Sequence, residues 1–418
     1  MVAKAHNFGG PHNDYGFHLD KTSDGFILCG DSAENAYVVK VDLCGQVQWS
    51  RSYRDTVQTH AQYITEIDNG YLMMGAINAG GGSGGFGSRA WMLHLNENGD
   101  SLWSKFYDVG YWGTWGKYIV THKDGYVMGT WEDGQTASNY HRLFLIDTLG
   151  TASDTVTVNL CSAINYPSQI IPTSDGGYIS AATNALYAPM LITQVVKVDS
   201  LLNITFDKWY QDLVFFTYSY TANGVCETPG GYMVVGGTDI TGTHQMYCMM
   251  LDLNGDSLWT KTFGSGELIC VKTLPDGFIM ASESTLVRTD FNADTLWTKP
   301  VNGTIRYLDV TEDGYVLIGD TSITWQQNSD AWLMLTDTYG NEISCTTLGL
   351  TYPTEKSIDI FPNPASGPVT INYPGDIFIY DTQGALIEKS FDNVMFSLPT
   401  GMYFVRTGLE CRKLLIIR

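Results

Sequence analysis

A short pattern that recurs seven times limits the fold of this chain more than any other feature. Each copy places a glycine directly before Phe or Tyr, and a short apolar run follows. The seven pairs are Gly25-Phe26, Gly70-Tyr71, Gly125-Tyr126, Gly177-Tyr178, Gly231-Tyr232, Gly277-Phe278 and Gly314-Tyr315. Their aromatic residues are 45, 55, 52, 54, 46 and 37 residues apart, a length that fits four short strands with their turns. The repeat therefore predicts a series of similar β units.

The order of features inside each copy indicates antiparallel strands joined by tight turns. Asn98-Gly99 and Asn254-Gly255 separate alternating or apolar runs, and Asn-Gly is a strong hairpin signal because both residues adopt positive φ readily. Helical periodicity of useful length is absent. Seven four-stranded units without covering helices predict an all-β fold, with a seven-bladed β-propeller over residues 1–348. In the second copy we expect strands at residues 61–66, 71–75, 90–95 and 102–107.

The outer strands are expected to join the blades and close the ring. Residues 3–10 are similar to the string at residues 260–264, so we predict that they join the seventh blade; the competing assignment uses residues 341–347. Closure of this kind removes exposed sheet edges. Val156 and Ile343 stand near the corresponding place in blades three and seven. In the other blades, tryptophans at one register of the outermost strand are predicted to pack between blades: Trp49, Trp103, Trp209, Trp259 and Trp297.

Charge and composition exclude several classes of partner. The chain has 44 acidic and 23 basic residues, and a net charge of −21 would repel a phosphate backbone, so no nucleic acid is expected. No stretch approaches the roughly 18 continuous apolar residues of a membrane-spanning helix. Residues 1–6 lack the apolar core of a signal peptide, so the protein is either cytosolic or has lost its leader.

Several strings look like functional motifs but are expected to be structural. The eight cysteines show no C-x-x-C spacing, so we expect no metal site, mostly buried thiols, and disulfides only in an oxidising compartment. Residues 78–88 contain both G-x-G-x-x-G and G-x-S-x-G, but this segment joins two strands and opens no helix. Calcium-like acidic triplets begin at Asp252 and Asp290, yet they lack the downstream acid of an EF-hand, which favours hairpin turns.

The C-terminal residues form a second unit with its own signature. Residues 358–367, 377–384, 398–405 and 412–418, taken in that order, resemble the type A sorting domain of the type IX secretion system of Bacteroidetes. Prolines and turn strings there also predict a small β-sandwich over residues 358–418, after a linker at 349–357. The residues that carry the sorting motif are Pro362, Asn363, Pro364, Asp381, Gly384, Gly401, Tyr403 and Lys413.

That resemblance implies an address and a partner. It implies recognition by the type IX secretion machinery, a protein that is secreted or attached to the outer cell surface, and a Sec leader before Met1 in the precursor. Residues 251–261 also look like the repeats of secreted bacterial propellers and of quinoprotein propellers. Quinone-dependent dehydrogenases of that kind are typically eight-bladed and carry adjacent cysteines, which this chain lacks, so no cofactor is expected.

Aromatic residues gather in the segments expected between strands two and three and between blades. Exposed rings on loops above a rigid scaffold suit stacking on sugars or capture of peptide side chains, so the sequence predicts a binding or adhesion module rather than an enzyme. Packing of the blade rims is the structural alternative. The enzymatic alternative is a polysaccharide hydrolase or lyase with carboxylates in the central channel. The candidate ligand-binding residues are Tyr107, Tyr111, Trp112, Trp115, Trp131, Tyr140, Phe215, Tyr218 and Trp325.

Overall fold

The computed structural model divides into two compact units, Met1–Ser344 and Cys345–Arg418, which are described separately. It describes residues 6–8, 12–53, 57–78, 87–107, 113–133, 139–160, 167–187, 190–210, 219–239, 242–321, 329–343, 359–372, 376–382, 385–391, 394–406 and 411–417. Every regular element within these ranges is a strand, as predicted.

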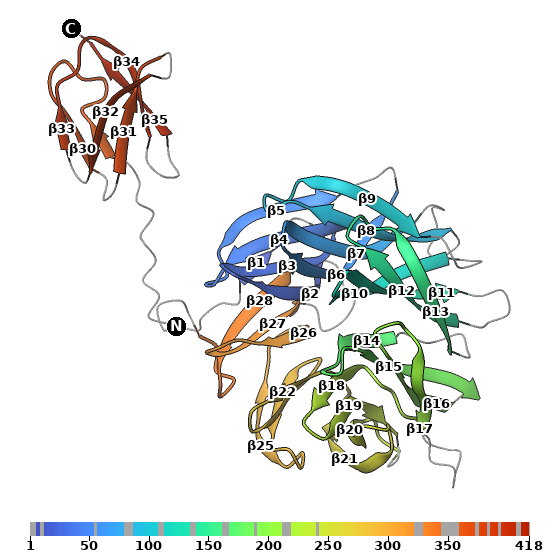
Figure 1. The fold of residues 1–418 in the computed structure, drawn as a ribbon. Coiled ribbons are helices and arrows are strands. Elements are labelled where there is room, and N and C mark those ends of the chain that lie inside the picture. Colours follow the sequence, from blue (N-terminus) through green and yellow to red (C-terminus); the bar gives the residue numbers. More distant parts are fainter. Residues whose placement is uncertain are drawn as a thin grey trace. The chain divides into compact units, whose positions relative to one another are not determined.

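The first unit consists of consecutive four-stranded antiparallel meanders (Figure 1). The strands of the first three meanders are β2 (Asp14–Thr22), β3 (Gly25–Ser32), β4 (Asn35–Asp42), β5 (Val47–Tyr53), β6 (Thr59–Ile67), β7 (Gly70–Asn78), β8 (Ser88–Leu95), β9 (Ser101–Tyr107), β10 (Gly113–His122), β11 (Gly125–Asp133), β12 (Asn139–Asp147) and β13 (Ala152–Leu160). The next three contain β14 (Pro167–Pro172), β15 (Tyr178–Tyr187), β16 (Met190–Val198), β17 (Ile204–Tyr210), β18 (Gly224–Thr228), β19 (Gly231–Thr238), β20 (Gln245–Asp252), β21 (Ser257–Ser265), β22 (Leu268–Leu274), β23 (Gly277–Ser282), β24 (Thr285–Thr289) and β25 (Thr295–Pro300). The last combines β26 (Thr304–Val310), β27 (Gly314–Asp320) and β28 (Ala331–Asp337) with β1 (His6–Phe8).

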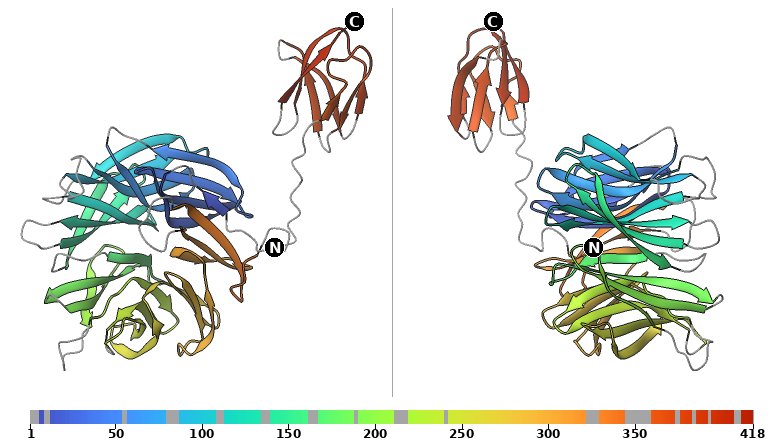
Figure 2. Two further views of the ribbon diagram at one scale, coloured as in Figure 1. Left: turned by 180° about the vertical axis from the view of Figure 1, so that it is seen from behind. Right: turned by 45° about the vertical axis from the view of Figure 1, so that its right-hand side comes forward.

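The innermost strands of these meanders contact one another in a closed cycle. The order of contact is β2, β6, β10, β14, β18, β22, β26 and back to β2. Figures 1 and 2 show the sheets set around a common centre. Radial sheets around a centre are the architecture of a β-propeller. A single parallel backbone pair, between Gly113 and Ser88, links the second and third meanders into an eight-stranded sheet. We interpret that sheet as two blades, which gives seven blades in all.

The N-terminal strand completes the last meander. β1 pairs with β28 from His6 opposite Leu333 to Phe8 opposite Ala331, which confirms the predicted joining of the chain's start to the seventh unit. The competing segment also pairs with β28, farther along it, because the Ile343 N–H donates to the Leu335 carbonyl at 2.9 Å. Both chain segments therefore cover the outer edge of β28.

The turns between third and fourth strands share one hydrogen-bond pattern. In the fifth unit, Asp252 Oδ1 accepts from the N–H groups of Asn254 at 2.9 Å and Asp256 at 2.7 Å, and Gly255 adopts φ +77°. The same carboxylate pattern occurs at Asp290. The calcium-like triplets are therefore hairpin turns, as predicted, because their first carboxylate is occupied by backbone donors.

An aromatic clasp joins each of several units to the next one. A Cβ built on Gly99 would lie 2.7 Å from the Trp49 ring, and the Tyr53 hydroxyl donates to the Gly99 carbonyl at 2.7 Å. Trp103 packs in the same way on Gly150. The corresponding pairs that follow are Trp103 with Tyr107, and Phe206 with Tyr210.

The predicted role of Trp209 in this clasp is wrong. In the fourth unit Phe206, not Trp209, packs on Gly255 of the next unit. Phe206 pairs with Lys197 at the register where Trp49 pairs with Lys40 in the first unit. Trp209 lies three residues farther along β17, and its indole N–H donates to Asp207 of the same strand at 3.1 Å.

The second unit contains two antiparallel sheets that share one core. β29 (Asp359–Phe361), β30 (Val369–Asn372) and β33 (Val394–Phe396) form one sheet, and β32 (Leu386–Phe391), β31 (Asp376–Tyr380), β34 (Gly401–Arg406) and β35 (Cys411–Ile416) form the other. Ile371 from the first sheet and Val405 from the second belong to the same buried cluster. This arrangement is what the β-sandwich interpretation expects.

Three of the eight sorting-motif residues form side-chain hydrogen bonds among the described residues of this unit. Asn363 donates to the Lys413 carbonyl at 2.7 Å and accepts from the Leu415 N–H at 3.0 Å, which ties the start of the unit to its last strand. The Tyr403 hydroxyl donates to the Pro399 carbonyl at 3.0 Å. Asp381 Oδ1 accepts from the Ala385 N–H at 2.9 Å. Of the remaining motif residues, Pro362 and Pro364 are exposed, Gly401 begins β34, and Gly384 lies outside the described residues.

Candidate functional site

The innermost strands of six units carry a register shift at the same level. In β2 the pairing skips Phe17, in β6 it skips Gln62, and in β10 it skips Lys117. The same shift occurs in β14, β22 and β26. A β-bulge leaves one residue unpaired and turns its side chain out of the sheet pattern. Each of these strands can therefore aim one extra side chain at the centre of the ring.

These positions obey a spacing rule that is visible in the sequence. In β2, β6, β10, β22 and β26 the skipped residue lies eight residues before the glycine of the repeated pattern, whereas in β14 it is Ser168, nine residues before Gly177. Asn223 has the same spacing from Gly231, although it directly precedes β18 and no shift occurs in that strand. The residues at this spacing line one common pocket; besides Gln169 they are Phe17, Gln62, Lys117, Asn223, Ile269 and Arg306.

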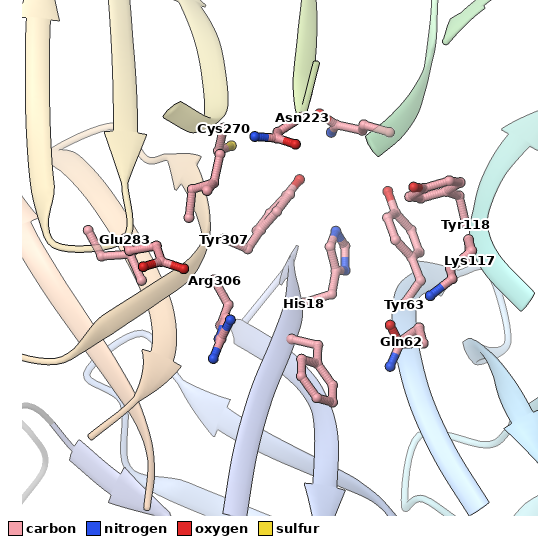
Figure 3. Close-up of a pocket in the computed structure, with 14 residues that line it drawn as sticks. His18, Gln62, Tyr63, Lys117, Tyr118, Asn223, Cys270, Glu283, Arg306 and Tyr307 are labelled. Carbon is pink, nitrogen blue, oxygen red and sulfur yellow. The ribbon is translucent and has the colours of Figure 1, made fainter. Parts of the chain in front are cut away.

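The central pocket, which has a volume of about 370 Å³, is formed by these six residues and a second group beside them (Figure 3). Glu283, from the connection between β23 and β24, also lines it, so the pocket lies toward the loops between second and third strands. We call this end of the ring the loop end. The other lining residues are His18, Tyr63, Tyr118, Gln169, Cys270, Ile305 and Tyr307.

Aromatic rings from four different strands meet in the pocket wall. The His18 ring stacks on Tyr63 with centroids 3.6 Å apart and lies 4.2 Å from the centroid of Tyr307. Tyr63 in turn meets Tyr118 edge to face at 6.2 Å. In Figure 3 the labelled rings of His18, Tyr63 and Tyr307 face the same space. The wall therefore offers both ring faces and hydroxyl groups.

The burial of His18 keeps its imidazole neutral. Burial first, and the nearby Lys272 ammonium second, hold the pKa of His18 well below its usual value. Nδ1 lies 3.0 Å from the Ile64 carbonyl oxygen and 3.5 Å from the Ile64 N–H, and because the nearer group can only accept, we assign the proton to Nδ1. Nε2 is then an acceptor, and it has no hydrogen-bond partner within the residues that the structure describes.

A hydrogen bond from Lys272 makes the Tyr307 hydroxyl oxygen an acceptor. Lys272 Nζ donates to Tyr307 Oη at 2.9 Å and lies 3.1 Å from Asp309. Burial alone would lower the pKa of Lys272, but Tyr307 and Asp309 outweigh it and hold that pKa well above its usual range. Because Tyr307 Oη accepts from the ammonium, its own proton is available to another acceptor.

Glu267 fixes the orientation of the Asn223 side chain. Asn223 Nδ2 donates to Glu267 Oε1 at 2.6 Å and to the Leu268 carbonyl at 2.9 Å. The Thr221 hydroxyl donates to the same carboxylate oxygen. Both partners of Nδ2 are acceptors only, so the amide cannot be reversed. Asn223 therefore presents its oxygen, Oδ1, as the free group.

Two basic side chains of the pocket lie beside carboxylates. Arg306 Nε donates to Asp320 Oδ2 at 2.8 Å, and Asp320 is fully buried. Burial lowers the pKa of Lys117 to about 8, although Asp31 opposes that shift. Asp31 itself is 2.6 Å from His60 Nδ1. The pocket is therefore polar and locally charge-balanced, not a strongly cationic site.

The predicted aromatic residues are brought together in part. Trp115 on β10 and Trp131 on β11 face each other with ring centroids 4.4 Å apart, and Trp115 precedes the pocket residue Lys117 by two positions. Tyr107 is a core residue rather than the exposed ring that the sequence suggested, because it is 9% exposed and its hydroxyl donates to Gly150. Tyr140 lies on β12, but its side chain is not described. The other predicted positions, Tyr111, Trp112, Phe215, Tyr218 and Trp325, lie outside the described residues.

Among the described lining residues the pocket has one carboxylate, whereas the enzymatic alternative calls for two. Glu283 is the one acidic residue among the lining residues that the structure describes. Glycosidases of both stereochemical classes normally need an acid and a second carboxylate across the scissile bond. Over the described ranges, no cluster of three His, Cys, Asp or Glu side chains could hold a metal ion. Hydrogen bonding and ring stacking are the chemistry that this pocket offers.

Comparison with known proteins identifies the second unit. Residues 359–414 match the secretion system C-terminal sorting domain. No curated protein matches the chain. The described residues contain no helix that is long and apolar enough to cross a membrane.

Several solved structures resemble the first unit at low identity. The WD40 domain of Neurospora crassa Pan2 is 13% identical, with 80% of this chain and 92% of that chain covered and a TM-score of 0.48. BamB from Moraxella catarrhalis is 11% identical, with 79% and 99% covered and a TM-score of 0.44. The AfRom2 CNH domain is 9% identical, with 81% and 99% covered and a TM-score of 0.49.

The radial arrangement of the four-stranded sheets establishes the propeller fold, and the matched domain establishes the route of export. Cys44 is disulfide-bonded, which agrees with an oxidising destination. This chain is a β-propeller protein with a type IX secretion sorting domain, and it is exported to the cell surface or beyond it.

Proposed function

We propose that this exported propeller is a binding or adhesion module whose ligand, a glycan or a peptide, is held at the loop end of the ring. The central pocket carries the proposal. Its volume of about 370 Å³ lies near the lower end of the roughly 300–1,000 Å³ typical of small-ligand sites. Its lining combines aromatic rings with a few polar groups, which is the composition that such sites share.

The way in which the backbone builds the pocket supports a binding role. A ring of sheets could close around apolar side chains alone, yet six innermost strands depart from regular pairing at one level. Bulges of this kind often re-aim side chains next to functional sites. Trp115 and Trp131 add an aromatic pair near the same end, which would suit a ligand longer than the pocket.

Glycan and peptide arrays probed with the full chain test this proposal. Phe17→Ala and Gln62→Ala should weaken the ligand found by at least about fivefold, because each removes a contact from the pocket wall. Gln48→Ala is the matched control, since Gln48 is exposed on the outer strand β5. A ligand that binds wild type and both pocket variants equally would refute a site in the central pocket. Trp115→Ala tests the aromatic pair separately.

A further inference from the structure

The polar groups of the central pocket present a definite set of donors and acceptors, and this set discriminates between ligand classes. Asn223 offers Oδ1, because Glu267 and the Leu268 carbonyl occupy its amide hydrogens. His18 offers Nε2 as an acceptor, because its proton lies on Nδ1 toward Ile64. Tyr307 offers a hydroxyl proton, because Lys272 donates to its oxygen.

A partner for these groups must both donate and accept within a small volume. Hydroxyl groups do so, and a pyranose carries several around one ring. A peptide backbone supplies donors and acceptors in a fixed linear order, and peptide-binding domains that read it commonly use an exposed sheet edge or an extended groove. Each innermost strand is the edge of its own meander, but these strands contact one another in a closed cycle around the pocket, so they form no extended groove for a peptide.

The electrostatic setting argues against a ligand whose recognition depends on charge. Arg306 is paired with the buried Asp320. Lys117 lies near Asp31, which is itself 2.6 Å from His60. Glu283 adds an acidic group at the pocket wall, and the chain as a whole carries a net charge of −21. An anionic ligand would approach against this field.

Resting on the proposed function, we propose that the central pocket binds a neutral, hydroxyl-rich sugar residue, such as the terminal hexose of a glycan. Its hydroxyls donate to Asn223 Oδ1 and to His18 Nε2 and accept from Tyr307 Oη, while the ring packs against Tyr63 and Phe17. Glu267 is a positioning residue, since it holds the Asn223 amide in the orientation that exposes the acceptor.

Neutral methyl hexosides, glucuronic acid and tripeptide amides are the probes for this inference, with binding to the full chain measured by calorimetry and ligand-observed NMR. We expect a neutral hexoside to bind at least about tenfold more tightly than glucuronic acid. Replacing one hydroxyl of the bound hexoside by fluorine removes a donor but keeps a weak acceptor. At the position that meets Asn223, this change should weaken binding to wild type about tenfold.

Variants assign that loss to particular protein atoms. In Asn223→Leu the fluorinated and parent sugars should bind equally, because the acceptor is gone. In Glu267→Gln the new amide can donate to Asn223, so the Asn223 amide is no longer held in one orientation. The loss of affinity caused by fluorine should then be smaller, while the parent sugar still binds. His18→Phe keeps a ring between Tyr63 and Tyr307 but removes the acceptor, and it should weaken the parent sugar. His94→Phe is the control, because His94 on β8 packs against Trp103 and does not line the pocket.

The outcomes separate this inference from the function on which it rests. Tighter binding of glucuronic acid or of a tripeptide in the pocket would overturn the neutral-sugar assignment and leave the binding module intact. Equal affinity of every fluorinated sugar for wild type would also overturn it, as would no binding of any neutral hexoside at 50 mM. An array ligand whose affinity is unchanged by Phe17→Ala and by Gln62→Ala would instead show that the pocket is not the binding site.

Discussion

The aromatic clasp between neighbouring units makes a quantitative prediction about Gly99. In Gly99→Ala the new Cβ would lie 2.7 Å from Cζ3 and 2.9 Å from Cη2 of Trp49, both far inside normal contact. The residue would also keep φ +79°, which costs an L-residue about 1–2 kcal/mol. Forcing the indole aside adds about 1–3 kcal/mol, as overpacking does elsewhere. The sum, about 2–5 kcal/mol, is a large part of the ~5–15 kcal/mol that stabilises a typical domain.

Gly176→Ala isolates the contribution of the tryptophan. Gly176 adopts φ +82°, but a Cβ there would meet no atom within 4 Å, so only the backbone cost applies. Urea unfolding of the full chain, followed by far-UV circular dichroism, should show Gly99→Ala less stable than Gly176→Ala by about 1–3 kcal/mol. In the Trp49→Leu background most of that difference should vanish. Equal destabilisation by the two alanines would refute the clasp as an energetic link between units.

Three further predictions concern charge and domain organisation. The N–H groups of Asp256 and Asn254 hold the pKa of Asp252 below its usual value, so the ionised carboxylate stabilises the folded state. This stabilisation is complete above pH about 3.9 and is lost as the pH falls through the lower pKa of the folded state. Asp252→Asn should therefore flatten that part of the acid-unfolding curve. Burial lowers the pKa of Lys117 to about 8, so NMR of ¹³C-methylated lysines should show one amine, absent from Lys117→Arg, that titrates well below the others. Truncation near Thr351 should leave the cooperative calorimetric transition of the first unit unchanged, because the two units are separately compact; a broadened transition would contradict this independence.

The strands and turns could be predicted because the same residues recur where the backbone needs them. In most units the turn before the outer strand contains a glycine with positive φ. The Asp or Asn three residues before that glycine accepts hydrogen bonds from the free N–H groups of the turn. The register of the outer strand survives one departure from this pattern, since Ala293 replaces the glycine in the sixth unit and the predicted Trp297 still packs on Gly340. In the fourth unit Leu202 takes the place of glycine at φ +62°, and a second aromatic residue, Trp209, follows Phe206. Counting aromatic residues alone therefore selected the wrong one.

The pocket escaped prediction because its signal is positional rather than chemical. One pocket residue from each unit stands eight residues before a repeated glycine, but the residue types differ, from Phe17 and Ile269 to Lys117 and Arg306. A search for motifs compares residue types, so it finds nothing at such a position. Of the predicted aromatics, Trp115 lies toward the same end of the ring as the pocket residue Glu283.

The contrast between repeated and varied positions explains how this ring can carry a binding site without weakening its fold. Glycines and turn carboxylates recur because a substitution there meets backbone atoms or leaves N–H groups unpaired. A bulged residue pairs with nothing in its sheet, so the fold places little demand on its side chain. In this chain the bulged position holds an aromatic, an amide, an ammonium, an aliphatic and a guanidinium group within one backbone geometry. Stability therefore resides in the repeated positions, and under the proposed function the varied positions would select the ligand.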